Sequence, residues 1–258
     1  MGKVWLGILG LLWSNWLFAQ VHAGAFLSEG SGKAISSIMA FSAYPAQRIP
    51  RTEVGVFGGK QFQTTLNRVG IISAIKVGTH SLVTGGDRFG SDVMHHDNIW
   101  AAYALPVSKT STIGLRTGIH FWKARGYNTH YDISIGVGWS SDISDQIHWR
   151  VQVDGIEKFW NPNYRTTYLV RSLIYYKVSD RAGLSLEAVL DDGQSTIVIP
   201  ALHYSFDDKI YCRMSAMSKL NAISFSLGYI EKGWGFETNL NMHNRLGMDG
   251  FIVVHYKF

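Results

Sequence analysis

The chain has 258 residues and a formal net charge of +5, and it is 46% hydrophobic but only 17% charged, with a mean hydropathy of +0.01. A bundle of transmembrane helices is excluded, because it would need several apolar runs of about 20 residues. A disordered chain is excluded by the 13% of aromatic residues. The one cysteine, Cys212, cannot form an internal disulfide, and no run of Lys or Arg is long enough to predict binding to nucleic acid.

The first predicted element is a secretory signal peptide at residues 1–23. Lys3 precedes an apolar run over residues 4–18, and a small-residue cleavage pattern ends at Ala23. A membrane anchor is the alternative, but the run is interrupted and short for a span. Ala19 offers a second cleavage point. We therefore predict export, with cleavage of this segment.

Residues 24–51 differ in composition from the rest of the chain. They are rich in Gly, Ser and Ala, and they end with Tyr44, Pro45 and Ala46 shortly before Pro50. A strand near residues 35–41 would be the fifteenth of the chain, whereas bacterial single-chain barrels normally have an even number of strands. We predict that residues 24–51 form a hatch or plug, and that residues 52–258 form the wall of a transmembrane β-barrel.

From residue 52 onward the side chains alternate with a period of two, which predicts strands. In residues 131–140, for example, Tyr131, Ile135 and Val137 share one face, with Ser, Gly and Asp on the other. Most strands are long enough to cross a bilayer when tilted, which takes about 9–11 residues. The fourteen predicted strands cover 52–61, 66–77, 78–85, 96–105, 110–122, 131–140, 146–154, 166–178, 181–191, 195–206, 209–217, 222–229, 234–242 and 247–258.

Tight turns alternate with longer connections along this series. The longer ones are predicted at 86–95, 123–129, 155–165 and 243–246. Short turns at one end and longer loops at the other are typical of outer-membrane barrels, whose short turns are periplasmic.

The strands of a soluble β-sandwich also have alternating side chains, so the chemistry of the two faces has to distinguish a sandwich from a membrane barrel. Sandwich strands average about 5–6 residues, and a water-exposed face would not be the bulky apolar one. In a barrel the apolar face meets lipid and the charged face lines the lumen. The candidate residues for the lumen lining or for ligand contact are Arg116, Arg150, Arg171, Arg213, Glu187 and Glu237. Their mixed signs favour a neutralising network in a filled interior over a selective pore.

The last strand places Ile252, Val254, Tyr256 and Phe258 on one face and ends in an aromatic residue. This pattern resembles the signal that the barrel assembly machinery recognises, although an ordinary edge strand could also end in Phe. The sequence thus predicts the bacterial outer membrane as location and its lipid as a partner.

Two clusters suggest other chemistry. His95 and His96 lie near acidic residues, but adjacent side chains on an extended chain point apart, so we predict no metal and no other cofactor. His203 and Ser205 share a face, as a lipid-active hydrolase would require. The chain has no Gly-x-Ser-x-Gly motif, and we predict that it is not an enzyme.

At the level of pattern, residues 30–155 resemble FadL-like 14-stranded outer-membrane proteins, and most closely the PorV/PorQ-type branch associated with type IX secretion. The resemblance rests on the Pro45-Ala46 step, the strand that starts at Thr52, and the strand-turn-strand segment over 99–115. Tyr44 stands where the family usually has Asn. The resemblance implies a barrel with a hatch that handles hydrophobic ligands or docks exported proteins.

The leading functional prediction is a non-enzymatic barrel that docks exported or surface proteins in a secretion-associated envelope complex. The first alternative is a FadL-like channel for hydrophobic small molecules. The second is a lipid-modifying outer-membrane enzyme.

Overall fold

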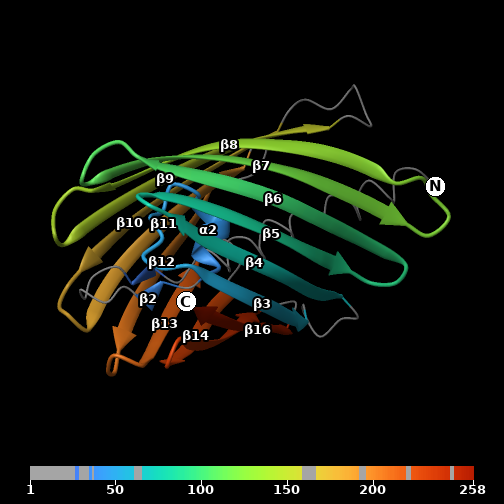
Figure 1. Cartoon of the computed structure of the whole chain (residues 1–258). Helices are drawn as coiled ribbons and strands as arrows, with labels where there is room; N and C mark the ends of the chain where they lie inside the picture. Colours follow the sequence, from blue (N-terminus) through green and yellow to red (C-terminus); the bar gives the residue numbers. More distant parts are fainter. Residues whose placement is uncertain are drawn as a thin grey trace.

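The computed structural model describes residues 27–28, 35–36, 38–60, 66–158, 167–191, 196–218, 222–244 and 247–258. Within these ranges fourteen antiparallel strands form one closed barrel (Figure 1), which confirms the predicted fold class and strand number. The predicted signal peptide lies outside the described residues. Among the residues described, no helix is long and apolar enough to cross a membrane.

Each strand of the wall pairs with its neighbours in sequence, and the last strand pairs with the first. The strands are β3 (Glu53–Lys60), β4 (Asn67–Val77), β5 (His80–Gly90), β6 (Met94–Pro106), β7 (Ser111–Ala124), β8 (His130–Asp142), β9 (Ile147–Lys158), β10 (Thr167–Lys177), β11 (Ala182–Asp191), β12 (Ile197–Ser205), β13 (Ile210–Met217), β14 (Ala222–Glu231), β15 (Trp234–His243) and β16 (Gly247–Lys257).

The alternation of side chains separates a lipid-facing surface from a lumen, as predicted. Ile135 and Val137 are 65% and 52% exposed on the outer face of β8. Asp132 and Ser134, on the inner face of the same strand, are 1% and 6% exposed. Bulky apolar side chains on the outside are favourable in hydrocarbon, where water is absent. The polar face is therefore the lumen.

The prediction of a long loop at 86–95 was wrong. β5 continues to Gly90 and β6 begins at Met94, so only three residues connect them. The alternation is hidden there because glycines carry no side chain to mark a face, and because Phe89 faces inward while Arg88 faces outward. Gly85, for example, lies under the ring of Trp100, and a Cβ would come within 2.6 Å of that ring. The predicted loop at 155–165 is also shortened, since β9 continues to Lys158.

The two ends of the barrel differ in the length of their connections. Thr52 and Phe258 meet at one end, where the Phe258 amide donates to the Thr52 carbonyl at 2.9 Å. The hairpin connections at that end have four residues or fewer. Lys232 and Gly233 both have positive φ angles, 51° and 89°, as a type I′ hairpin requires. This is the short-turn end, which is periplasmic in outer-membrane barrels.

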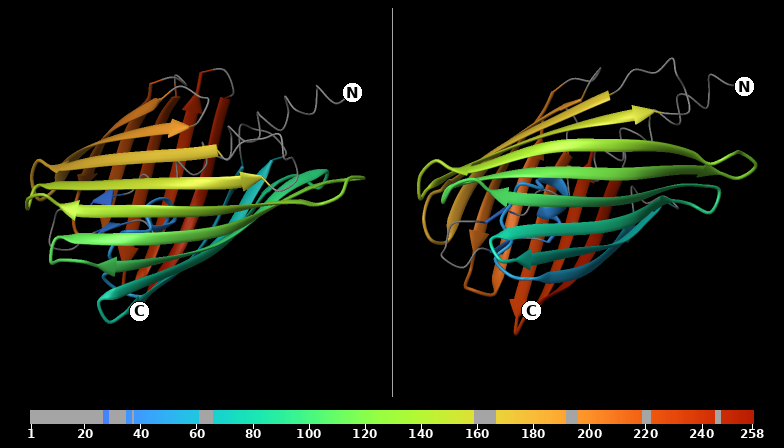
Figure 2. Two further views of the ribbon diagram at one scale, coloured as in Figure 1. Left: turned by 90° about the horizontal axis from the view of Figure 1, so that it is seen from above. Right: turned by 45° about the horizontal axis from the view of Figure 1, so that its top comes forward.

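The segment before the wall includes a short helix, α2 (Ala40–Ala43), which the barrel encloses (Figure 2). A separate two-stranded sheet joins β1 (Leu27–Ser28) to β2 (Ile35–Ser36). Ile38, Ala40 and Phe41 are each 0% exposed. The part of the predicted hatch from Ile38 to Gln47 thus lies within the barrel, whereas Arg48, Pro50 and Arg51 are exposed.

Candidate functional site

The hatch is joined to the wall by a buried hydrogen bond. Tyr44 follows α2, and its hydroxyl donates to the Glu187 carboxylate of β11 at 2.7 Å. Tyr44 is 1% exposed, and burial beside Glu187 raises the pKa of the phenol well above its usual range. The phenol therefore stays protonated and remains a donor.

Two further side chains anchor the hatch. The Gln47 amide oxygen accepts from the Arg150 guanidinium of β9 at 3.2 Å. Arg48 donates from Nε to the Thr112 hydroxyl at 2.9 Å and from Nη1 to the Lys109 carbonyl at 2.6 Å, at the short-turn end. Gln47 and Arg48 are not predictable as anchors from the sequence, because their partners are far away in sequence.

Pro45 and Ala46 lie directly against the wall at two glycines. A Cβ on Gly114 of β7 would lie 2.5 Å from the Ala46 amide nitrogen and 2.7 Å from the Pro45 carbonyl carbon. A Cβ on Gly138 of β8 would lie 3.3 Å from the Ala46 side chain. The absence of side chains on these two glycines lets the hatch backbone approach the wall.

Apolar packing also holds the hatch. Ile38, Met39, Phe41 and Ile49 form one buried cluster with residues of the wall. Those wall residues belong to β4, β5, β6 and β16, and they are Ile72, Ala74, Val83, Trp100, Ala102 and Val253. The hatch is thus fixed both by apolar contacts and by directional hydrogen bonds.

All six predicted lumen residues are buried on the inner face of the wall, with exposed fractions of 1–7%. Four of them gather around Tyr44, since their charges act on Tyr44 or on its partner Glu187: Arg150, Arg171, Glu187 and Arg213. Arg116 lies over the Trp100 ring, 4.8 Å from its centroid. Glu237 lies elsewhere, so the six do not form one site, and a role in ligand contact stays a prediction.

Glu237 belongs to a cluster at the junction of the first and last strands. The His255 ring of β16 lies between the Glu53 carboxylate of β3 at 3.3 Å and the Glu237 carboxylate of β15 at 3.6 Å. Lys257 approaches Glu53 at 3.2 Å. Gly235 makes room for the imidazole, because a Cβ there would lie 1.9 Å from it. This cluster is not predictable from the sequence, because its members lie at opposite ends of the wall sequence.

The predicted assembly signal lies on the outer face of β16. Ile252 and Phe258 are 59% and 71% exposed, and Tyr256 packs against the rings of Trp234 and Phe258 with centroids 5.0 Å away. Val254 lies on the same face, half-buried. This placement is consistent with the lipid-facing pattern, and recognition by the assembly machinery stays a prediction.

Of the two histidine clusters, the one at His95 and His96 has another environment than predicted. His96 is on β6 rather than in a loop, and it stacks on Trp122 with ring centroids 4.1 Å apart. Within the described part of the chain no group of three or more His, Cys, Asp or Glu residues could hold a metal ion. His203 bonds to the Ser185 hydroxyl at 2.8 Å, and its cross-strand neighbour is Arg213. A cation beside the ring opposes the positive charge that a general base acquires.

No family model matches the chain, and no curated protein sequence matches it. Its fold is similar to that of the toluene transporter TbuX of Ralstonia pickettii, with a TM-score of 0.67 at 9% identity over 92% of this chain and 98% of that one. It is also similar to a TodX deltaS2S3 mutant monoaromatic hydrocarbon channel, with a TM-score of 0.65 at 7% identity over 86% and 95%. The P. putida toluene transporter TodX gives 0.58 at 8% identity over 90% and 96%.

These identities are too low to carry more than the fold. The fold is a closed 14-stranded barrel similar to that of these hydrocarbon channels and transporters, so the predicted FadL-like resemblance is confirmed at the level of the fold. The assignment to the PorV/PorQ-type branch stays a prediction.

Proposed function

We propose that this chain is an outer-membrane channel, without enzymatic activity, that admits small hydrophobic molecules to a Gram-negative cell. The observation that carries the proposal is a hatch inside a barrel that shares nearly its whole fold with a toluene transporter. A hatch blocks the lumen to bulk water and solutes, so passage is restricted to molecules that the hatch and wall admit.

The inner surface at the long-loop end supports an apolar substrate. Five adjacent strands, β10 to β14, each contribute one buried inward-facing apolar residue near that end: Leu169, Val189, Ile199, Met217 and Ala222. These residues are only 1–4% exposed, so a hydrophobic molecule would reach them only when their present neighbours move apart. It would then leave water, which is favourable by about 25 cal/mol per Å² of apolar surface buried. A channel for sugars or ions would gain nothing from such a surface.

Docking of exported or surface proteins, the leading sequence-based prediction, has less support. The similar structures described above are hydrocarbon channels and transporters by their own descriptions. The contacts of residues 38–51 are also those expected of a segment that closes the lumen, and a docking subunit would not need such a segment. The channel is therefore the function we propose in place of docking.

The test requires cells, because toluene crosses a plain phospholipid bilayer unaided and only a lipopolysaccharide layer slows it. A Gram-negative host without a hydrocarbon channel of its own, carrying a cytoplasmic toluene-responsive reporter, would express the chain. The proposal predicts a faster reporter response than in the same host expressing an unrelated outer-membrane barrel at equal level. Equal responses, with this barrel correctly folded in the membrane, would refute the proposal.

A further inference from the structure

The pairing of β12 with β13 is interrupted at Pro200. The two strands pair from Ala201 and Ser215 to Ser205 and Tyr211, although β12 already begins at Ile197 and β13 continues to Met217. Proline has no N–H and removes one hydrogen bond from a sheet, so it is rare in central strands.

The nitrogen of Pro200, which has no hydrogen to donate, faces β13. Beyond the gap, the Ser218 amide donates to the Val198 carbonyl at 3.0 Å, and the Val198 amide donates to the Ser218 hydroxyl at 3.0 Å. Backbone groups two residues apart in a strand point the same way, so the nitrogen of Pro200 also points toward β13. In this register Pro200 stands opposite Ala216, where the ladder is weakest.

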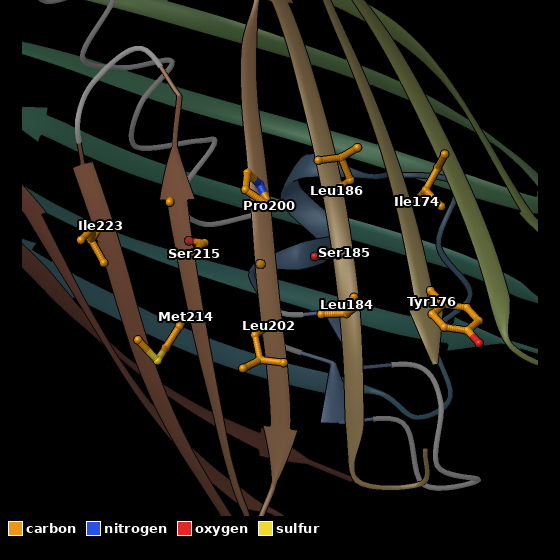
Figure 3. A pocket seen from close by; sticks show the side chains of 12 residues that line it. Ile174, Tyr176, Leu184, Ser185, Leu186, Pro200, Leu202, Met214, Ser215 and Ile223 are labelled. Atoms are coloured by element: carbon orange, nitrogen blue, oxygen red, sulfur yellow. The ribbon is translucent and has the colours of Figure 1, made fainter. Parts of the chain in front are cut away.

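A groove of about 680 Å³ lies on the outer face of the wall over this gap (Figure 3). Large apolar side chains form its sides, and all are about half exposed: Leu184, Leu186, Leu202, Met214 and Ile223. Pro200 and Ala216, which are short, lie between them. The groove exists because short side chains occupy the centre of a surface that is otherwise covered by Leu, Ile and Met.

The groove lies near the middle of the bilayer. Six residues separate Pro200 from Phe206 at the short-turn end, which is about 20 Å along a strand. With a strand tilt of roughly 35–45°, this is about 15 Å along the membrane normal, or half of a hydrocarbon core of about 30 Å. The acyl chains of both leaflets end at this depth, and Leu184, Leu202 and Met214 extend the groove from there toward the short-turn, periplasmic side.

We propose that this groove binds the end of one acyl chain of a phospholipid from the periplasmic leaflet. The walls offer almost only apolar atoms, and an empty groove in hydrocarbon would forfeit dispersion contacts that a chain restores. No headgroup is preferred, because two lysines at the rim below are already paired, and the exposed Arg181 beside them would meet the phosphate that all phospholipids share. Lys177 bonds Asp180 at 2.7 Å, and Lys209 bonds Glu231 at 2.9 Å. This site depends on the barrel alone and not on the channel function.

The test uses the full chain in vesicles of phosphatidylethanolamine that contain a trace of the same lipid with a photoreactive group at the end of one acyl chain. After irradiation, the labelled peptides are mapped by mass spectrometry. The proposal predicts that label concentrates on β12 and β13 over the other lipid-facing strands. An even distribution around the barrel would overturn it, since ordinary surrounding lipid labels every strand alike.

Ala216→Phe fills the groove, and Ala101→Phe is the matched control on the outer face of β6. An acyl chain that loses the burial of about two methylene groups binds about tenfold more weakly. Ala216→Phe should therefore lower the excess of label on β12 and β13, relative to the other lipid-facing strands, by about that factor. Ala101→Phe should leave it unchanged. If Ala216→Phe does not fold, as judged by its heat-modifiable mobility in gels, Ala216→Leu serves in its place.

Two further labelling experiments distinguish an acyl chain from other occupants of the groove. Phosphatidylglycerol carrying the same photoreactive chain should label as strongly as phosphatidylethanolamine, because the chain and not the headgroup is bound. Toluene added before irradiation should not displace the label. Displacement by toluene would overturn the proposal in favour of a hydrocarbon site, and unchanged labelling in the groove-filling variant would overturn it in favour of nonspecific contact.

Discussion

The hydroxyl of Tyr44 donates to the Glu187 carboxylate at 2.7 Å, which joins the hatch to a wall strand 143 residues later in the sequence. Both side chains are buried, with exposed fractions of 1%. Apolar packing holds the hatch in the lumen without fixing its orientation, whereas a buried hydrogen bond is directional. The orientation of the hatch therefore depends on this pair, together with the hydrogen bonds of Gln47 and Arg48.

Replacing Tyr44 with Phe should loosen the hatch. The change removes the donor and leaves the buried carboxylate of Glu187 with one fewer partner, at a cost of about 1–3 kcal/mol. Hydrogen exchange of residues 38–51 should become faster. Tyr168→Phe is the control, since Tyr168 is 54% exposed on the outer face. Equal exchange in Tyr44→Phe and in the unaltered chain would show that the hydrogen bond does not hold the hatch.

Replacing Gly114 with Ala should displace Pro45 and Ala46 from the wall. The added methyl group would meet the hatch backbone at 2.5 Å, and overpacking of this kind costs about 1–3 kcal/mol. In planar bilayers the variant should open more often. Gly155→Ala is the matched control, because its Cβ would meet nothing closer than 3.6 Å. If both variants conduct like the unaltered chain, the close approach at Gly114 does not position the hatch.

Replacing His255 with Ala should weaken the junction between β16 and β3. The ring separates the buried carboxylates of Glu53 and Glu237, and removing one member of a buried charged cluster costs about 3–5 kcal/mol. The urea concentration at the unfolding midpoint should fall in detergent. His130→Ala changes an exposed histidine and should leave the midpoint nearly unchanged. A midpoint that is the same in both variants would contradict a structural role for His255.

Acid should weaken the turn at residues 206–209. The Lys209 and Ile210 amides both donate to the Asp207 carboxylate at 2.7 Å, and these bonds lower the pKa of Asp207. Its stabilisation is thus present above the ordinary Asp pKa of about 3.9 and is lost as the pH falls through the lower folded-state value. Exchange of the two amides, corrected for intrinsic rates, should accelerate there, and Asp207→Ala should abolish the pH dependence. A protection factor that is constant with pH in the unaltered chain would contradict this.

The wall could be predicted from the sequence because the alternation of apolar and polar residues within each strand indicates which of its sides faces lipid. Residues 131–140 and 222–229 alternate without exception, and the structure places them as predicted. The prediction failed near 86–95, where glycines carry no side chain to mark a face. Pro200 is the local signal that was overlooked, since a proline inside a predicted strand marks a weak point in a sheet.

The contacts of the candidate site could not be predicted in the same way. Tyr44 with Glu187, Gln47 with Arg150, and Glu53 with His255 are each separated by more than 100 residues. No local period relates such partners, because their proximity is created by closure of the barrel. The sequence indicated which side chains face the lumen but not which of them meet.

The most direct test of the proposed channel compares entry of toluene and of a disaccharide into cells that express either the intact chain or a chain without residues 24–50. We expect the intact chain to admit toluene but not the sugar, and the shortened chain to admit both, because removal of the hatch opens the lumen to water. Entry of the sugar through the intact chain as fast as through the shortened one, or no entry of toluene above the host without the chain, would contradict a hydrophobic channel controlled by its hatch.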